Sequence, residues 1–131
     1  MSILFTLLTA ITAKASIDKE AFLYAIRQVE SGDNHAAIGK RGERGAYQFM
    51  PSTWKKHSKQ SHKNAHSETS ATIVAFNHLE YLIKKVGGDD VKKLALAWNC
   101  GLRGMKKPSN RSKNYAERVM NLYLHKTGDY P

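Results

Sequence analysis

The feature that most restricts the fold of this chain is a helical repeat of apolar residues, interrupted once by a segment spaced with glycines. Phe22, Ile26 and Val29 recur at intervals of four and three residues, which places them on one face of a helix over residues 18–31. Similar intervals recur later, and helical patterns dominate the chain. The sequence therefore predicts a mainly α-helical fold.

Four further helices are expected from apolar periodicity and from residues that start or stop helices. They cover residues 51–57, 67–86, 91–100 and 113–125. Pro51 suits the first turn of its helix, and Asp18 and Ser112 are the expected N-caps of the first and last helices. Gly32 and Gly101 follow helices that they can end, since glycine readily adopts the left-handed conformation found there.

The interruption spans residues 32–45. Gly39, Gly42 and Gly45 are evenly spaced in it, and four charged residues lie among them. The spacing matches neither a phosphate-binding loop nor a dinucleotide fingerprint, because no Gly-Lys-Ser/Thr closes it and no strand pattern precedes it. We expect a long loop or a small β-hairpin here, and a second, polar loop over residues 58–66.

Composition limits the number of domains and the kind of partner. A chain of 131 residues with 41% hydrophobic residues suits one domain with its own core. Lys and Arg exceed Asp and Glu by 21 − 11 = 10. This excess favours anionic partners, namely nucleic acid, acidic lipid or an anionic cell-wall polymer.

The N-terminus resembles a secretory signal peptide. Residues 3–13 are almost all apolar or Thr, and Ala13-Lys14-Ala15 forms a small-x-small site before Ser16. We therefore expect a signal peptide over residues 1–15 and one domain over 16–131, exported to the periplasm or the cell exterior. No Lys or Arg precedes the apolar run, so a buried N-terminal helix and an uncleaved anchor are the alternatives. The run is too short to span a bilayer.

The sequence offers no convincing metal site or nucleophile. His57, His62 and His66 lie close in sequence but lack a Cys or a well-placed Asp beside them. Cys100 has no adjacent His and sits among apolar residues, so we expect it in the core. We expect neither a metal ion nor a cofactor.

Glu30 is the strongest candidate for chemistry. It lies at the end of the first helix, near Val29 and Ile26, and directly before the glycine-spaced segment. Glycoside cleavage needs a carboxylic acid that stays protonated near neutral pH, which an apolar and partly desolvated setting can provide. A solvated glutamate at a helix end is the alternative, so position alone does not decide its role.

Three further segments follow Glu30-Ser31 in a recognisable order. They are "GAYQFMPSTW", with Gln48 eighteen positions after Glu30, then "LALAWNCG" with Asn99, then "RSKNYAERV" with Tyr115. In this order they resemble the soluble lytic transglycosylase (SLT) domain of the goose-lysozyme-like superfamily. The resemblance covers about residues 18–125. It implies a small lysozyme-like helical domain and an enzyme that cuts peptidoglycan.

The resemblance implies a role for each matching residue. Glu30 would be the catalytic acid and base. Substrate-binding or supporting roles would fall to Ser31, Tyr47, Gln48, Asn99 and Tyr115. Asn99 would bond the sugar near its N-acetyl group, and Tyr115 would lie across the cleft from the carboxyl of Glu30. Four residues depart from the family pattern, namely Tyr47, Phe49, Trp98 and Cys100. Each replaces one hydrophobic residue by another, so we expect them to change the shape of the cleft wall without abolishing the cleft.

The implied reaction cuts the β-1,4 bond between N-acetylmuramic acid and N-acetylglucosamine and leaves a 1,6-anhydromuramoyl end. A single acid suffices if the substrate supplies the second group, although most glycosidases use two carboxylates. The alternative within the same fold is a hydrolytic muramidase, in which Asp33 could position a water; Asp33 also suits a loop turn. We expect a monomer acting on glycan strands, with a secretion, conjugation or phage apparatus as candidate settings.

A basic, non-enzymatic protein that binds cell wall or nucleic acid is the alternative of a different class. Nucleic-acid binding would require cations clustered along one recognition face. Here they are spread in pairs along the chain, as in Lys55-Lys56 and Lys106-Lys107. The pattern thus indicates no specific nucleic-acid partner.

Overall fold

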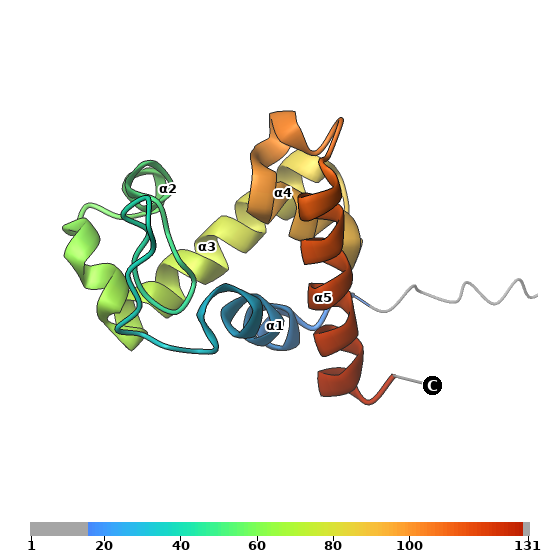
Figure 1. The fold of residues 1–131 in the computed structure, drawn as a ribbon, viewed down its shortest axis with the longest axis horizontal. Coiled ribbons are helices and arrows are strands. Elements are labelled where there is room, and N and C mark those ends of the chain that lie inside the picture. Colours follow the sequence, from blue (N-terminus) through green and yellow to red (C-terminus); the bar gives the residue numbers. More distant parts are fainter. Residues whose placement is uncertain (1–15, 130–131) are drawn as a thin grey trace, which may run out of the picture.

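The computed structural model describes residues 16–129, which form five α-helices and one 3₁₀-helix (Figure 1). The elements are α1 (Lys19–Ser31), α2 (Pro51–His57), η1 (His62–His66), α3 (Glu68–Val86), α4 (Val91–Gly104) and α5 (Asn110–Thr127). This confirms the predicted mainly α-helical class. The predicted signal peptide over residues 1–15 lies outside the described residues.

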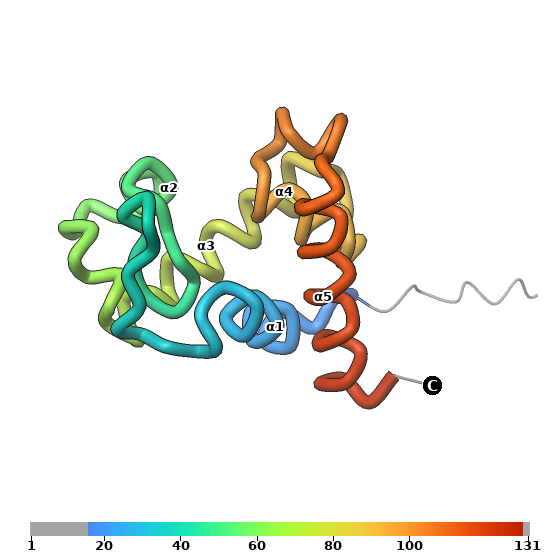
Figure 2. The backbone as a smooth tube through the Cα atoms, in the orientation of Figure 1, coloured from blue at the N-terminus to red at the C-terminus, as the bar shows by residue number. Residues whose placement is uncertain are grey.

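Helix α3 links two parts of the molecule. On one side lie the segment after α1, α2 and η1, and on the other side lie α4 and α5 (Figures 1 and 2). Helix α1 packs against both α5 and α3, and α4 packs against α3 and α5. The last turn of α1 contacts both parts, since Ser31 bonds to Ala46 in the loop and Tyr115 of α5 bonds to Glu30. Within residues 16–129, no helix is long and apolar enough to cross a membrane.

Helix α1 begins and ends as the sequence predicts. The side chain of Asp18 accepts a hydrogen bond from the backbone N–H of Ala21 at 3.0 Å, which satisfies one of the unpaired donors of the first turn. Gly32 ends the helix in the left-handed conformation, at φ 65°. Phe22 and Ile26 are fully buried on its inner face. These local signals hold Glu30 in the last turn of a well-anchored helix.

The segment after α1 is a loop and not a regular hairpin. It contains two isolated antiparallel bridges, between Ile38 and Arg44 and between Arg44 and Phe49. Gly45 adopts φ +81°, and a Cβ built there would lie 2.0 Å from the backbone oxygen of Ala65 in η1. Only glycine permits this contact, which fixes the loop against η1.

Three predicted boundaries differ from the structure. The expected loop over 58–66 contains η1, which Ser61 caps by accepting from the backbone of Lys63. Gly101 breaks α4 as expected, at φ 76° and ψ 168°, but the chain resumes helical structure as far as Gly104. Helix α5 starts at Asn110, because the hydroxyl of Ser109 caps the N–H of Ser112 at 3.1 Å. Ser112 was therefore wrongly predicted as the cap.

An aromatic cluster forms the centre of the core. Tyr47 packs against Phe49 with ring centroids 5.4 Å apart, and Trp98 packs against both rings at about 6 Å. Trp54 adds to the cluster through Phe49 and is 1% exposed. The cluster joins the loop and α2 to α4, and Tyr47, Phe49 and Trp98 of this cluster line an open cavity.

Candidate active site

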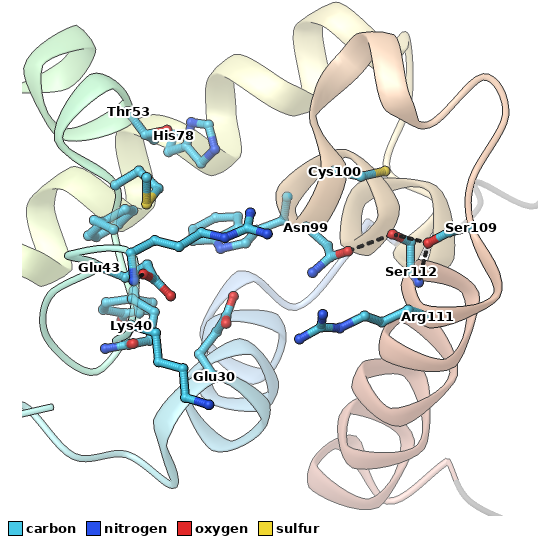
Figure 3. Close-up of a pocket in the computed structure, with 16 residues that line it drawn as sticks. Glu30, Lys40, Glu43, Thr53, His78, Asn99, Cys100, Ser109, Arg111 and Ser112 are labelled. Carbon is cyan, nitrogen blue, oxygen red and sulfur yellow. Dashed lines mark hydrogen bonds between the residues drawn. The ribbon is translucent and has the colours of Figure 1, made fainter. Parts of the chain in front are cut away.

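An open cavity of about 910 Å³ lies between the loop after α1 and the helices α3, α4 and α5 (Figure 3). Glu30 enters it from the end of α1, and Asn99 enters it from α4. The loop contributes Tyr47 and Gln48 to the same lining. Four of the six predicted site residues thus line one cavity. The two others, Ser31 and Tyr115, are not among its lining residues but bond to groups beside it.

The carboxyl of Glu30 is partly buried in the lining of this cavity. Burial raises the pKa of Glu30 to about 7, because desolvation disfavours the charged form. A hydrogen bond from Tyr115 opposes this shift, and the negative charge of Glu43 adds to it. A carboxyl with a pKa near 7 is a proton donor at neutral pH that can also act as a base once it has given up the proton.

Tyr115 lies next to the carboxyl of Glu30, as the resemblance implies. Its hydroxyl donates to Oε2 of Glu30 at 3.0 Å, and its side chain is 8% exposed. Burial and the neighbouring carboxylate together raise the pKa of Tyr115 well above its usual value, so its phenol keeps its proton. The bond ties α5 to α1 and fixes the direction of the carboxyl.

Ser31 acts on the backbone of the loop. Its hydroxyl donates to the backbone oxygen of Ala46 at 2.7 Å and accepts from the N–H of Asn34 at 3.0 Å. These bonds hold the loop against the last turn of α1. Ser31 therefore positions the segment that carries the next two site residues.

Tyr47 and Gln48 have different surroundings. Tyr47 is 1% exposed, and its hydroxyl accepts a 2.9 Å hydrogen bond from Nη1 of Arg27. Gln48 has a left-handed backbone, at φ 51°, and its amide nitrogen donates to the oxygen of Gly45 at 2.8 Å. Tyr47 gives the cavity a rigid aromatic wall. Gln48 uses its amide donor to hold the loop in shape while lining the same space.

Asn99 is exposed at the end of the unbroken part of α4. Its Oδ1 accepts a 2.8 Å hydrogen bond from the hydroxyl of Ser112, which is buried in α5 (Figure 3). This bond assigns the amide oxygen inward, so the NH₂ group is the donor that remains for a ligand. The sequence pattern predicted Ser112 only as a helix cap, because a contact between residues of two different helices leaves no local signal.

The second carboxylate of the cavity is Glu43 and not Asp33. Asp33 pairs with Nε of Arg27 at 2.9 Å, adopts φ 62° and is not among the lining residues. Glu43 lines the cavity, and its Oε1 accepts from the backbone N–H of Arg41 at 2.6 Å. A Cβ at Gly39 would lie 2.4 Å from Oε2 of Glu43, so the carboxylate packs directly over Gly39 and a larger side chain there would displace it. The charged loop was noticed in the sequence, but its acid was not singled out.

A buried histidine on the α3 side of the cavity was not among the residues predicted for the site. His78 in α3 is 8% exposed and packs edge-on against Trp98, with ring centroids 4.8 Å apart. Burial, together with the nearby charges of His57 and Lys56, lowers the pKa of His78 to about 3. His78 is therefore neutral, and its Nδ1 shares a 2.9 Å hydrogen bond with Nε2 of His57. The position of His78 within the apolar stripe of α3 was the sequence signal that could have indicated its burial.

Cys100 is half-buried and lines the cavity, which corrects its predicted place in the core. Its thiol donates to the backbone oxygen of Leu96 at 3.0 Å. Trp98 and Phe49 pack in the aromatic cluster and line the cavity as well. Among residues 16–129 no group of three or more His, Cys, Asp or Glu side chains is arranged to hold a metal ion.

A mainly helical domain that presents a partly buried carboxyl with a raised pKa to an open polar cavity is consistent with a small lysozyme-like α domain. The family model of the transglycosylase SLT domain matches residues 8–121 of the 131. The chain therefore belongs to this family, whose members are lytic transglycosylases acting on the glycosidic bonds of peptidoglycan. No curated protein matches the chain.

The family match confirms the resemblance found in the sequence and the enzyme class that it implied. It disfavours the non-enzymatic alternative. The match begins at residue 8, within the segment predicted as a signal peptide, so the division of the chain at residue 15 stays a prediction.

Proposed function

We propose that this chain is a lytic transglycosylase that cuts the β-1,4 bond between N-acetylmuramic acid and N-acetylglucosamine, with Glu30 as its single acid and base. The observation that carries the proposal is the carboxyl of Glu30. It lines a cavity of about 910 Å³, is held by the Tyr115 hydroxyl at 3.0 Å, and has a pKa raised to about 7 by burial.

The proposed reaction uses this one carboxyl twice. Protonated Glu30 gives its proton to the bridging oxygen, and the bond from that oxygen to C1 of the muramoyl residue breaks. The N-acetyl oxygen of the same sugar stabilises the developing positive charge at C1. The carboxylate of Glu30 then takes the proton of the C6 hydroxyl, whose oxygen bonds to C1. The product is a 1,6-anhydromuramoyl end, and Glu30 is protonated again.

The other site residues take supporting roles in this proposal. Tyr115 directs the carboxyl, and Asn99 offers its NH₂ group to a carbonyl such as that of an N-acetyl group. Tyr47 provides an aromatic wall, Gln48 keeps the loop in shape, and Ser31 ties that loop to α1. A pyranose has apolar ring faces and polar edges, so a wall of rings and amides suits it.

The test is digestion of purified peptidoglycan by the wild-type chain and by Glu30→Gln, with products identified by mass spectrometry. Anhydromuramoyl ends should appear with wild type, and the variant should be slower by roughly 100- to 10,000-fold, the usual contribution of a general acid. Circular dichroism should show that the variant is folded. A wild-type digest without anhydro ends would contradict the proposal.

A hydrolytic muramidase is the second candidate, and Glu43 is the observation that favours it. Its carboxylate lines the same cavity as Glu30 and raises the pKa of that residue. In this alternative Glu43 would position a water for attack on C1, and the product would be a reducing muramoyl end. The same digest distinguishes the two, because a hydrolase gives reducing ends.

The place of action is also part of this proposal. An enzyme of peptidoglycan needs access to the wall, which supports export to the periplasm or the cell exterior. We propose a monomer that acts on glycan strands, with a secretion, conjugation or phage apparatus as the settings to examine. Fractionation of cells that express the full chain would test the location.

A further inference from the structure

Three cationic side chains reach the cavity of Glu30 from two walls. Lys40 and Arg41 belong to the loop after α1, and Arg111 belongs to the first turn of α5. In Figure 3, Lys40 and Arg111 extend into the cavity from opposite sides, with Glu30 between them. None of these three side chains makes an ion pair with another residue in 16–129.

Other cations of the chain are arranged differently. Lys92 pairs with Glu117 at 2.7 Å, Arg27 pairs with Asp33, and Lys19 pairs with Glu80. A chain with ten more cations than anions must leave many cations without a partner, so a lack of pairing alone indicates little. The informative feature is that three of them converge on one concave space.

The local charge of the cavity is positive. With Glu30 protonated, the three cations and the carboxylate of Glu43 sum to 3 − 1 = +2. Like charges held around one cavity repel each other, and an anionic ligand relieves this repulsion. Arginine is well suited to the task, because its planar fork matches the geometry of a carboxylate.

We propose that Lys40, Arg41 and Arg111 form a carboxylate-binding set that recognises the lactyl-peptide substituents of the glycan. This inference rests on the proposed function, which puts a muramoyl residue beside Glu30. Each muramoyl residue carries a lactyl group at C3, whose carboxyl is either free or joined as an amide to a peptide that bears carboxylates of its own. A neutral polymer of N-acetylglucosamine offers none. The set thus selects peptide-substituted peptidoglycan among N-acetylated glycans.

Binding, and not cleavage, is the direct test. The full chain with Glu30→Gln is titrated calorimetrically with three soluble oligosaccharides of equal length. These are peptide-substituted glycan, the same glycan after an amidase has left only the lactyl carboxylate, and a neutral N-acetylglucosamine oligomer. We expect affinity to rise with the number of carboxylates, by roughly tenfold or more from the neutral to the peptide-substituted ligand.

The test variant is Lys40→Gln, Arg41→Gln and Arg111→Gln combined. It should bind the three ligands with similar affinities, because the set that distinguishes them is gone. Its thermal unfolding should match that of the parent, since two of the positions lie in a loop and all three are exposed. The single variant Arg111→Gln provides a check, with a smaller loss that is limited to the anionic ligands.

The matched control is Lys84→Gln, Lys93→Gln and Arg103→Gln combined. These three residues are exposed and lie outside the cavity lining. Both triple variants change the net charge of the chain from +10 to 10 − 3 = +7. The control should keep the full preference for peptide-substituted over neutral ligands, because this preference depends on cations that line the cavity and not on the net charge of the chain.

Equal affinity of the parent for peptide-substituted and neutral ligands would overturn the inference, and so would equal losses in the two triple variants. If the lactyl carboxylate alone gives the full affinity, the set binds that group and the peptide adds nothing. If wild type shows the preference but cleaves no glycan, the proposed function fails and the binding inference stands.

Discussion

The hydroxyl of Tyr115 donates a 3.0 Å hydrogen bond to Oε2 of Glu30, although 85 positions separate the two residues in the chain. The bond joins the last turn of α1 to α5 and lies beside the cavity that Glu30 lines. It stabilises the charged carboxylate, and burial of Glu30 stabilises the neutral acid more strongly. The balance of these two effects keeps the pKa near 7.

Replacement of Tyr115 by Phe should shift this balance. Loss of the hydrogen bond raises the pKa of Glu30 further. The pH above which the activity falls should therefore increase. The maximal rate should fall by roughly tenfold, because the carboxyl is no longer directed. Both effects can be read from a pH–rate profile on peptidoglycan.

Tyr123→Phe is the control for that experiment. Its hydroxyl accepts from the backbone N–H of Asp18 at 3.0 Å, and it is not among the residues that line the cavity. Each Phe variant should lose about 1 kcal/mol of unfolding free energy with its hydrogen bond. Only the change at Tyr115 should move the pH profile, and a similar shift in both variants would contradict the proposed link.

Glu30 should also make the stability of the fold depend on pH. Its pKa is raised on folding from 4.5 to about 7, so between these values the folded state binds more protons than the unfolded state. Stability from this group is present below pH 4.5 and is lost as the pH rises through 7. The full change is up to about 3 kcal/mol.

Glu30→Gln should therefore be more stable than wild type at pH 8 to 9 and gain little or nothing at pH 4, a range set by the pKa shift. Denaturant unfolding of both proteins at several pH values measures this difference. A gain in unfolding free energy that is the same at every pH would show that the carboxyl of Glu30 is not desolvated in the folded protein.

Replacement of Glu43 by Gln removes a like charge from the cavity. The pKa of Glu30 should fall, and the pH above which the activity is lost should decrease with it. A transglycosylase should keep its anhydro products, because the substrate supplies the second reacting group. Loss of nearly all activity would instead support the hydrolytic alternative. Glu20→Gln, at an exposed acid in the first turn of α1, is a matched control.

Two glycines of the loop should respond differently to alanine. Gly42 and Gly45 both have positive φ, at +86° and +81°. A Cβ at Gly42 meets nothing within 4 Å, so the cost should be the conformational strain of about 1–2 kcal/mol. A Cβ at Gly45 would meet the backbone oxygen of Ala65 at 2.0 Å. Gly45→Ala should therefore cost several kcal/mol more and lower the activity by displacing Tyr47 and Gln48.

Thermal and denaturant unfolding of these two variants give the comparison directly. The peptidoglycan digest then shows whether the loop has moved. Equal stabilities of Gly42→Ala and Gly45→Ala would mean that the loop does not press against η1 as described.

Local signals in the sequence were enough for the helical class and for several helix ends. Asp18 and Gly32 act on atoms within one turn of themselves, so their effects can be predicted from neighbours in the chain. The position of Glu30 at the end of α1 follows from the same signals. Where two local signals competed, prediction was less accurate, as with Ser109 and Ser112 before α5.

Only the tertiary structure decided which groups surround the carboxyl. Asp33 is closer to Glu30 in sequence than Glu43, yet Asp33 pairs with Arg27 and Glu43 lines the cavity. Arg111 reaches the same space from α5. The raised pKa of Glu30 is likewise a property of the packed state, since desolvation arises when distant segments close around a charge. Helix signals are short-range, whereas burial and charge convergence depend on contacts between residues far apart in the chain.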